Sequence, residues 1–326
     1  MKTNTPMFLL LMMVTTFFVV ISTSSMFAWM MMELNMLAFI PLICLKKSTM
    51  EADISLKYLI PQSFASSWFM ISIIMSTFSS HSKILASVAL LMKAGSVPMH
   101  SWFPAVMYSI NTLAGFALMT WQKIVPLFLL SVQQLSHTPL ILTSVIMSAT
   151  WGSIAGLNQT NIISMLTFSS IAHLSWLIMA SLLSIKTLSM YLMSYALTLL
   201  PIFISLNIYN MKMHKTIMCE MMEKYLQITL MLNFLSLAGM PPLAIFLNKI
   251  IIIYLMSKTA MTFILVFMLI SSAISLYFYI IIAFTAMFDY SKPLSFTNKM
   301  TLPKLIFILS ALFQFFPLFL GICPLP

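Results

Sequence analysis

Charged residues are scarce in this sequence, and arginine is missing altogether. Only 7% of the 326 residues are charged, namely 16 lysines and 6 acidic residues, whereas 61% are hydrophobic and the mean hydropathy is +1.04. Soluble domains carry charge on about a quarter of their residues. A chain this apolar cannot present a water-soluble surface, so the composition indicates a membrane protein without a soluble domain, a single membrane domain over 1–326.

Cysteine is also rare, which argues against metal and redox centres. Cys44, Cys219 and Cys323 lie far apart and form no CxxC pair, so neither an iron–sulfur cluster nor a zinc site is expected. The net charge of +10 comes from lysines scattered singly between apolar runs, not from a basic stripe with aromatics, which argues against nucleic-acid binding. We therefore expect no cofactor and no metal on this chain.

Methionine is abundant where arginine is absent. The chain has 33 methionines, a usage typical of mitochondrial genomes, in which codon reassignment adds methionine and AT bias removes arginine. The first residues contain only Lys2 and no Arg-rich amphipathic stretch, so no removable presequence is expected. The prediction is an organelle-encoded protein of the mitochondrial inner membrane.

The apolar residues form long continuous runs, which favours membrane-spanning helices of about 20 residues each. Polar residues separate these runs, and we predict an all-α polytopic protein with about eleven transmembrane helices. The expected spans are 6–22, 26–45, 58–78, 84–107, 111–131, 138–156, 161–183, 187–209, 226–256, 260–288 and 303–321.

The lysines outside these spans are distributed unevenly between the two membrane sides. If successive spans alternate in direction, the side of the N-terminus carries Lys2, Lys46, Lys47, Lys57, Lys212, Lys215, Lys224, Lys292, Lys299 and Lys304, and the other side carries Lys83, Lys186 and Lys258. Because basic residues favour the inner compartment, the N-terminus is expected on the matrix side.

Four charges fall deep within apolar runs: Glu33, Lys93, Lys123 and Lys249. Each mid-membrane charge costs about 2.5–3.5 kcal/mol on insertion scales, so their presence favours internal pairing, internal water and use in proton transfer. Burial disfavours a charged amine and a nearby carboxylate favours it, so Glu33 near Lys93 would form a switch. Static ion pairs or snorkelling are the structural alternatives, and a retinal Schiff base would need only one lysine.

His173 lies in the apolar stretch TFSSIAHLSWLIMAS. It could belong to a proton wire between the lysines. A neutral histidine held by a serine or a backbone carbonyl is an equally good interpretation.

Two spans carry helix-breaking residues beside a deep lysine. Gly95 and Pro98 follow Lys93, and Gly239, Pro241 and Pro242 precede Lys249. Proline removes a backbone donor, so both spans should be discontinuous at membrane depth. They are the fourth and ninth spans and would cross in opposite directions, as in transporters with inverted repeats. A structural kink without function is the alternative.

These stretches resemble the antiporter-like subunits of respiratory complex I, and the NADH dehydrogenase subunit 2 family in particular. The matching segments run in the expected order from the second span to the ninth: ELNMLAFIPL at 33–42, MKAGSVPMHSWFP at 92–104, TWQKIVP at 120–126, GLNQTNIISMLTFSSIAHLSW at 156–176 and LAGMPPLAIFLNK at 237–249.

The resemblance implies a fold of two inverted five-helix repeats and a proton-translocating subunit of a mitochondrial NADH:ubiquinone oxidoreductase. It places Glu33, Lys93, Lys123 and Lys249 at the family's intramembrane charged positions, with His173 as a candidate relay member. FMN, iron–sulfur clusters and ubiquinone are then expected on partner subunits, and neighbouring antiporter-like subunits and membrane lipids are the expected contacts. A stand-alone ion/proton antiporter subunit is the alternative, and an inert membrane scaffold is a third.

Overall fold

The computed structural model of the chain describes residues 5–45, 48–76, 81–209, 224–241, 243–259, 261–288 and 306–314. Nearly all of these residues are helical, and seven spans are long and apolar enough to cross a membrane. They are Ser25–Ile43, Thr49–Met75, Thr112–Leu130, Thr138–Leu157, Ile162–Leu183, Ile185–Ile208 and Thr262–Phe284. The described part of the chain therefore confirms the predicted all-α architecture.

The chain divides into two compact units, which we describe separately. Unit 1 comprises Met1–Ser148 and Leu177–Ile185, and unit 2 comprises Ala149–Trp176 and Lys186–Pro326. The division therefore passes through two helices, α8 (Thr138–Leu157) and α9 (Ile162–Leu183).

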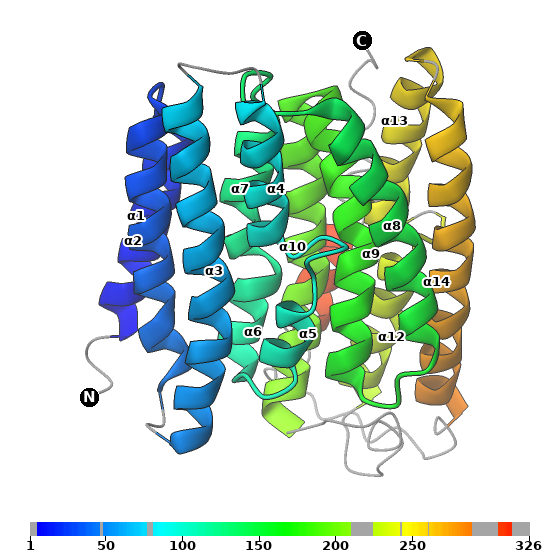
Figure 1. Cartoon of the computed structure of the whole chain (residues 1–326). Helices are drawn as coiled ribbons and strands as arrows, with labels where there is room; N and C mark the ends of the chain where they lie inside the picture. Colours follow the sequence, from blue (N-terminus) through cyan, green and yellow to red (C-terminus); the bar gives the residue numbers. More distant parts are fainter. Residues whose placement is uncertain are drawn as a thin grey trace. The chain divides into compact units, whose positions relative to one another are not determined.

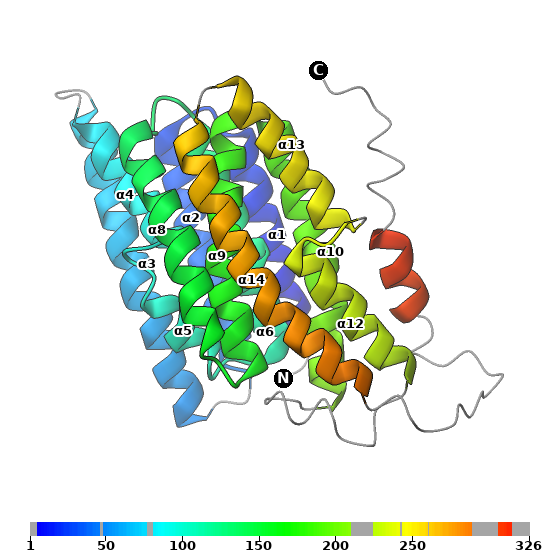
Figure 2. The ribbon, with the colours of Figure 1, turned by 90° about the vertical axis from the view of Figure 1, so that its right-hand side faces the viewer.

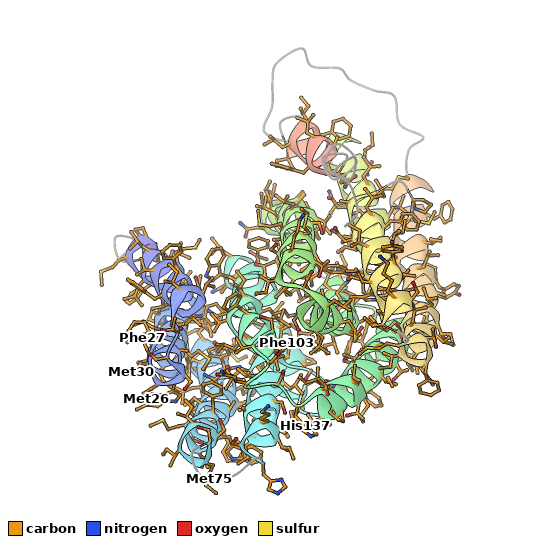
Figure 3. All side chains as sticks on the ribbon, turned by 90° about the horizontal axis from the view of Figure 1, so that it is seen from above. Met26, Phe27, Met30, Met75, Phe103 and His137 are labelled. Atoms are coloured by element: carbon orange, nitrogen blue, oxygen red, sulfur yellow. The ribbon has the colours of Figure 1, made fainter. Side chains whose placement is uncertain are left out.

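Unit 1 begins with three uninterrupted helices, followed by two interrupted ones (Figure 1). Helix α1 packs on α2, α2 on α3, and α3 on both α4 and α5, while α7 returns to contact α1 and α4. Viewed from above, Met26, Phe27 and Met30 lie at the edge of this unit and Phe103 lies inside it (Figure 3). The elements are α1 (Thr5–Ile21), α2 (Ser25–Ile43), α3 (Thr49–Met75), α4 (Ser82–Ala94), α5 (Trp102–Met107), α6 (Thr112–Met119), the 3₁₀ turn η1 (Trp121–Lys123) and α7 (Ile124–Leu130).

Unit 2 contains a second interrupted span. Helices α12 and α13 follow one another along α14, with the break between them (Figure 2). Gly152 of α8 lies so close to α9 that an added Cβ would stand 2.6 Å from the backbone nitrogen of Ala172, which explains the glycine there. The remaining elements are α10 (Ile185–Tyr209), α12 (Lys224–Ala238), α13 (Ala244–Lys258) and α14 (Thr262–Phe288).

Most predicted spans match observed helices, and two differ in an informative way. The span predicted to start at residue 58 starts at Thr49, because Ser48 caps the helix by accepting a hydrogen bond from the backbone N–H of Glu51 at 3.2 Å. The span 111–131, predicted to be continuous, is interrupted at η1. Of the last predicted span, only 306–314 falls within the described residues.

Candidate proton-transfer site

The break after α4 is built from a left-handed glycine and a set of side chains that satisfy the freed carbonyls. Gly95 has φ 77°, a conformation that disfavours any side chain, and its N–H donates to the Met92 carbonyl at 3.1 Å. The indole N–H of Trp102 donates to the same carbonyl at 3.1 Å, and the amide of Gln62 donates to the Lys93 carbonyl at 3.4 Å. Polar side chains, not the lysine amine, therefore replace the missing helical partners here.

Lys93 and Lys123 line one cavity inside unit 1. Its volume is about 30 Å³, which is room for about two water molecules. The polar groups in its wall come from five elements of the unit, namely α2, α3, α4, α5 and η1. The lining residues are Met32, Asn35, Met36, Tyr58, Gln62, Lys93, Ala94, Trp102, Phe103, Leu118, Gln122, Lys123, Val125 and Pro126.

Lys123 ends the 3₁₀ turn η1 and is only 2% exposed. Pro126 has no N–H to offer the carbonyl of Gln122, so the regular α-helical ladder cannot continue through this point. The Lys123 amine lies 5.1 Å from the ring centroid of Phe103, within the range of a cation–π interaction. The turn thus places the amine of this lysine beside an aromatic face at the cavity.

Glu33 lies on α2 and is half-buried. Within the described residues no ion pair of 4.0 Å or less joins Glu33 to Lys93, and the Lys93 amine makes a weak contact with the Met32 sulfur at 3.9 Å. The carboxylate of Glu33 and the amine of Lys93 are therefore not bound together in this structure.

An amide pair connects the helix of Glu33 to the turn of Lys123. The Gln122 amide donates to the Asn35 side-chain oxygen at 3.3 Å, and it also contacts the Met12 sulfur at 3.2 Å. Our sequence analysis missed these amides, although Asn35 and Gln122 each lie within two residues of a deep charge in a strongly apolar run, a signal that could have been used.

The break before α13 brings the third deep lysine onto a glycine. Gly239 has φ 82°, and a Cβ added to it would lie 2.9 Å from the Lys249 nitrogen. The lysine therefore folds back from α13 onto the break itself. Its amine lies 5.5 Å from the ring of Trp176, and Lys249 is 7% exposed.

His173 and Lys249 line a second cavity, inside unit 2. This cavity has a volume of about 10 Å³, the size of one water molecule. The imidazole is 4% exposed, and its Nδ1 lies 2.9 Å from the Tyr191 hydroxyl. The other lining residues are Ser169, Ala172, Trp176, Ser271, Ser272 and Ser275.

The structure thus sorts the five predicted site residues into two sets. Glu33, Lys93 and Lys123 belong to unit 1, and His173 and Lys249 belong to unit 2. In each set a lysine lies beside a helix break and a small polar cavity. Amines, imidazole, amides and hydroxyls around cavities large enough for water are groups that can pass protons.

Comparison with known proteins identifies the family. Residues 75–275 match the family described as "NADH:quinone oxidoreductase/Mrp antiporter, TM". The NADH-ubiquinone oxidoreductase chain 2 of Anopheles gambiae is 35% identical over 323 residues, which cover 94% of this chain and 94% of that protein. The chain belongs to the NADH-ubiquinone oxidoreductase chain 2 family.

A further member of the family and two solved structures with the same fold are also similar to this chain. The family member from Lemur catta is 32% identical over 87% of this chain and 86% of its own length. A chain of respiratory complex I from Thermus thermophilus has the same fold, with a TM-score of 0.82 at 20% identity, covering 98% of this chain and 79% of that one. A chain of the Mrp complex from Dietzia sp. gives a TM-score of 0.72 at 12% identity over 90% of this chain and 62% of that one.

Family membership confirms the predicted antiporter-like, multi-pass membrane fold. The seven long apolar helices of the described residues agree with it. The roles of the five predicted residues are not decided by similarity of this kind, and they rest on the geometry above.

Proposed function

We propose that this chain is a proton-translocating core membrane subunit of a respiratory NADH:ubiquinone oxidoreductase. The single observation that carries the proposal is the cavity that Lys93 and Lys123 share in unit 1. Placing two amines inside an apolar unit costs free energy. A role in passing protons through confined water would account for their presence. Because the chain belongs to the NADH-ubiquinone oxidoreductase chain 2 family, this oxidoreductase is the enzyme in which such a relay would operate.

In the relay of unit 1, Glu33 determines whether Lys93 holds or releases its proton. A carboxylate that approaches Lys93 stabilises the ammonium form, and a carboxylate that withdraws allows the buried amine to release its proton. The cavity water and the amides of Gln122 and Gln62 then give that proton a hydrogen-bonded route toward Lys123. The separation of Glu33 from Lys93 corresponds to the state in which release is favoured.

Unit 2 supplies a second relay of the same kind. His173 and Lys249 share a cavity of about one water molecule, and three serine hydroxyls of α14 line its wall. Imidazole changes its charge near neutral pH and exchanges protons through either nitrogen. We therefore favour His173 as a relay member over a purely structural histidine.

The redox chemistry is assigned to partner subunits. FMN, iron–sulfur clusters and ubiquinone would lie on those chains, and this chain would contact neighbouring antiporter-like subunits and lipids of the mitochondrial inner membrane. The lysine excess on the side of the N-terminus supports a matrix location for that end. The solved structures with this fold are chains of respiratory and Mrp complexes, which supports work inside a multi-subunit membrane complex.

A stand-alone ion/proton antiporter subunit is the less favoured function. Its main support is the likeness to the Mrp chain, which at 12% identity concerns the fold alone. The chain 2 relative from Anopheles gambiae, in contrast, matches over 94% of this chain and 94% of its own length. Co-migration decides between them: the native chain should run with NADH dehydrogenase activity on a mild-detergent native gel. Migration apart from that activity would overturn the proposed function.

A further inference from the structure

We propose that the Tyr58 hydroxyl is a relay group in unit 1: it takes a proton from cavity water that Lys93 has protonated and gives its own proton to cavity water that passes it to Lys123. This inference rests on the proposed function, because it concerns the path between the two lysines. The observation behind it is that, among the described residues that line their shared cavity, Tyr58 alone carries a hydroxyl group.

The packing of Tyr58 fixes where its hydroxyl lies. Tyr58 belongs to α3 and is 2% exposed. Its ring meets the ring of Phe39 at 5.1 Å and the ring of Trp102 at 5.9 Å between centroids, in both cases edge to face. Trp102 is itself held by the hydrogen bond from its indole to the Met92 carbonyl. A ring held from two sides keeps its orientation, so the hydroxyl keeps its place in the wall.

The hydroxyl of Tyr58 is open to the cavity. It makes no hydrogen bond with another described residue, and it is not one of the polar atoms that the described core encloses completely. The small exposed part of the side chain therefore includes the hydroxyl oxygen, and the space that it reaches is the cavity. Gln62, one helical turn further along α3, lines the same cavity, so this face of the helix is turned toward it.

A hydroxyl can pass on a proton in a way that the neighbouring amides cannot. An amide accepts at its oxygen and donates from its nitrogen, so a proton taken up at one atom is not given away by the same atom. The amides of Gln62 and Gln122 also donate to oxygen atoms of the protein. A phenol carries a donor proton and accepting lone pairs on one oxygen. Apart from the two lysines, Tyr58 is therefore the lining side chain suited to receive and release protons.

The proton balance closes on the tyrosine. The ammonium of Lys93 releases a proton to a cavity water, and the hydronium so formed gives a proton to Oη of Tyr58. The O–H bond already present at Oη breaks, and that proton passes through a second water to the neutral amine of Lys123, which becomes an ammonium. One O–H bond forms and one breaks, so Tyr58 ends as a neutral phenol. The cavity has room for about two water molecules, as this transfer requires.

Tyr58→Phe tests the relay, because it removes the hydroxyl and keeps the ring between Phe39 and Trp102. The measurement is the rate of NADH-driven proton translocation per assembled complex in sealed vesicles. We expect this rate to fall by about fivefold, the equivalent of one hydrogen bond lost from the transfer path. The melting temperature of the complex should not fall, because the variant loses no hydrogen bond to a described residue.

Ser66→Ala is the matched control. It removes another buried hydroxyl of α3, one that donates to the Ser63 carbonyl at 2.8 Å and does not line the cavity. This variant should translocate protons at the unmodified rate. Tyr58→Leu separates chemistry from packing: it removes the ring as well and should lower the melting temperature, yet its assembled complexes should translocate protons no more slowly than those of Tyr58→Phe.

The outcomes separate this inference from the proposed function, which Lys123→Ala tests. If Lys123→Ala leaves proton translocation unchanged, the proposed relay itself fails. If Lys123→Ala abolishes translocation but Tyr58→Phe works at the unmodified rate, or falls no further than Ser66→Ala, the role of Tyr58 is wrong. Failure of Tyr58→Phe to assemble would also contradict the inference, because it would show that the hydroxyl stabilises the fold.

Discussion

Lys93 and Lys123 lie on different elements of unit 1 and line the same cavity of about 30 Å³. Lys93 lies in the last turn of α4, just before the break, and Lys123 ends a 3₁₀ turn. Both interruptions free backbone groups and make room for water where a regular helix would leave none. The predictions below follow from this arrangement and from its counterpart in unit 2.

Glu33 and Lys93 should act as one switch. Glu33→Gln and Lys93→Met should each impair proton translocation, and the double variant should be no worse than the worse single one. The physical reason is that a carboxylate that approaches or leaves a buried amine changes how firmly the amine holds its proton. The measurement is a double-mutant cycle on the logarithm of the translocation rate. Additive losses would mean that the residues act at separate steps.

Gly239→Ala should do more harm than Gly95→Ala. Both glycines have positive φ, of 82° and 77°, so alanine should cost about 1–2 kcal/mol of strain at either position. Only at Gly239 would the new methyl group also displace the Lys249 amine, which stands 2.9 Å from the Cβ position. Because the backbone strain is alike at the two positions, the thermal stability of the assembled complex should fall by a similar amount in both variants.

The two glycine variants are distinguished by activity. Proton translocation per NADH oxidised should fall in Gly239→Ala well beyond its value in Gly95→Ala. Equal translocation in the two variants would show that the contact between Lys249 and Gly239 does not contribute to proton translocation.

Trp102→Phe should weaken the first helix break without altering its chemistry. The change removes the indole donor from the Met92 carbonyl, and a buried carbonyl that loses a partner costs about 1–3 kcal/mol. Trp68→Phe is the control, because no hydrogen bond of the Trp68 indole occurs in the described residues. The melting temperature of the complex should drop in the first variant only; a drop of the same size in the control would contradict this account of the break.

The purified chain should show no visible absorption from a flavin, haem or iron–sulfur centre. Its three cysteines are spread singly along the sequence, and the described residues contain no group of three or more His, Cys, Asp or Glu side chains that could hold a metal ion. An absorbance spectrum with protein quantified in the same sample is sufficient. A stoichiometric chromophore would place a redox centre on this chain and contradict the proposal that redox chemistry belongs to the partner subunits.

Much of the fold follows from hydropathy alone, because a membrane-spanning helix must be long and apolar. The two breaks at Gly95 and Gly239 were also predictable, since glycine and proline act locally on the backbone. The start of α3 at Thr49 was missed although Ser48 and Glu51 have the spacing of a capping box. The first turns of α3 contain several charged residues, as loops do. We gave this composition more weight than the capping spacing and therefore placed the start of the helix too late.

The composition of the cavities could not be predicted in the same way. Tyr58, Gln62 and Gln122 are polar residues in helices, and nothing in their local sequence tells which of them meet. Glu51 lies between the predicted spans 26–45 and 58–78, yet it is 6% exposed and accepts a hydrogen bond from the Asn111 amide at 3.1 Å. Such contacts depend on how helices pack, which a single sequence does not encode locally.

The interruption at Lys123 was missed for a different reason. Pro126 gave a local signal, but a proline near the middle of a strongly apolar run is compatible with a simple kink. The structure shows a 3₁₀ turn instead, and this turn brings the lysine to the cavity.

The central claim is that protons pass through the cavity shared by Lys93 and Lys123, and Lys123→Ala tests it most directly. The measurement is the number of protons translocated per NADH oxidised by the assembled complex in sealed vesicles, with Lys83→Ala, an exposed lysine at the start of α4, as the control. The account predicts that Lys123→Ala assembles normally and loses most of its proton translocation, while Lys83→Ala behaves like the unmodified chain. Normal translocation by a fully assembled Lys123→Ala complex would contradict the account.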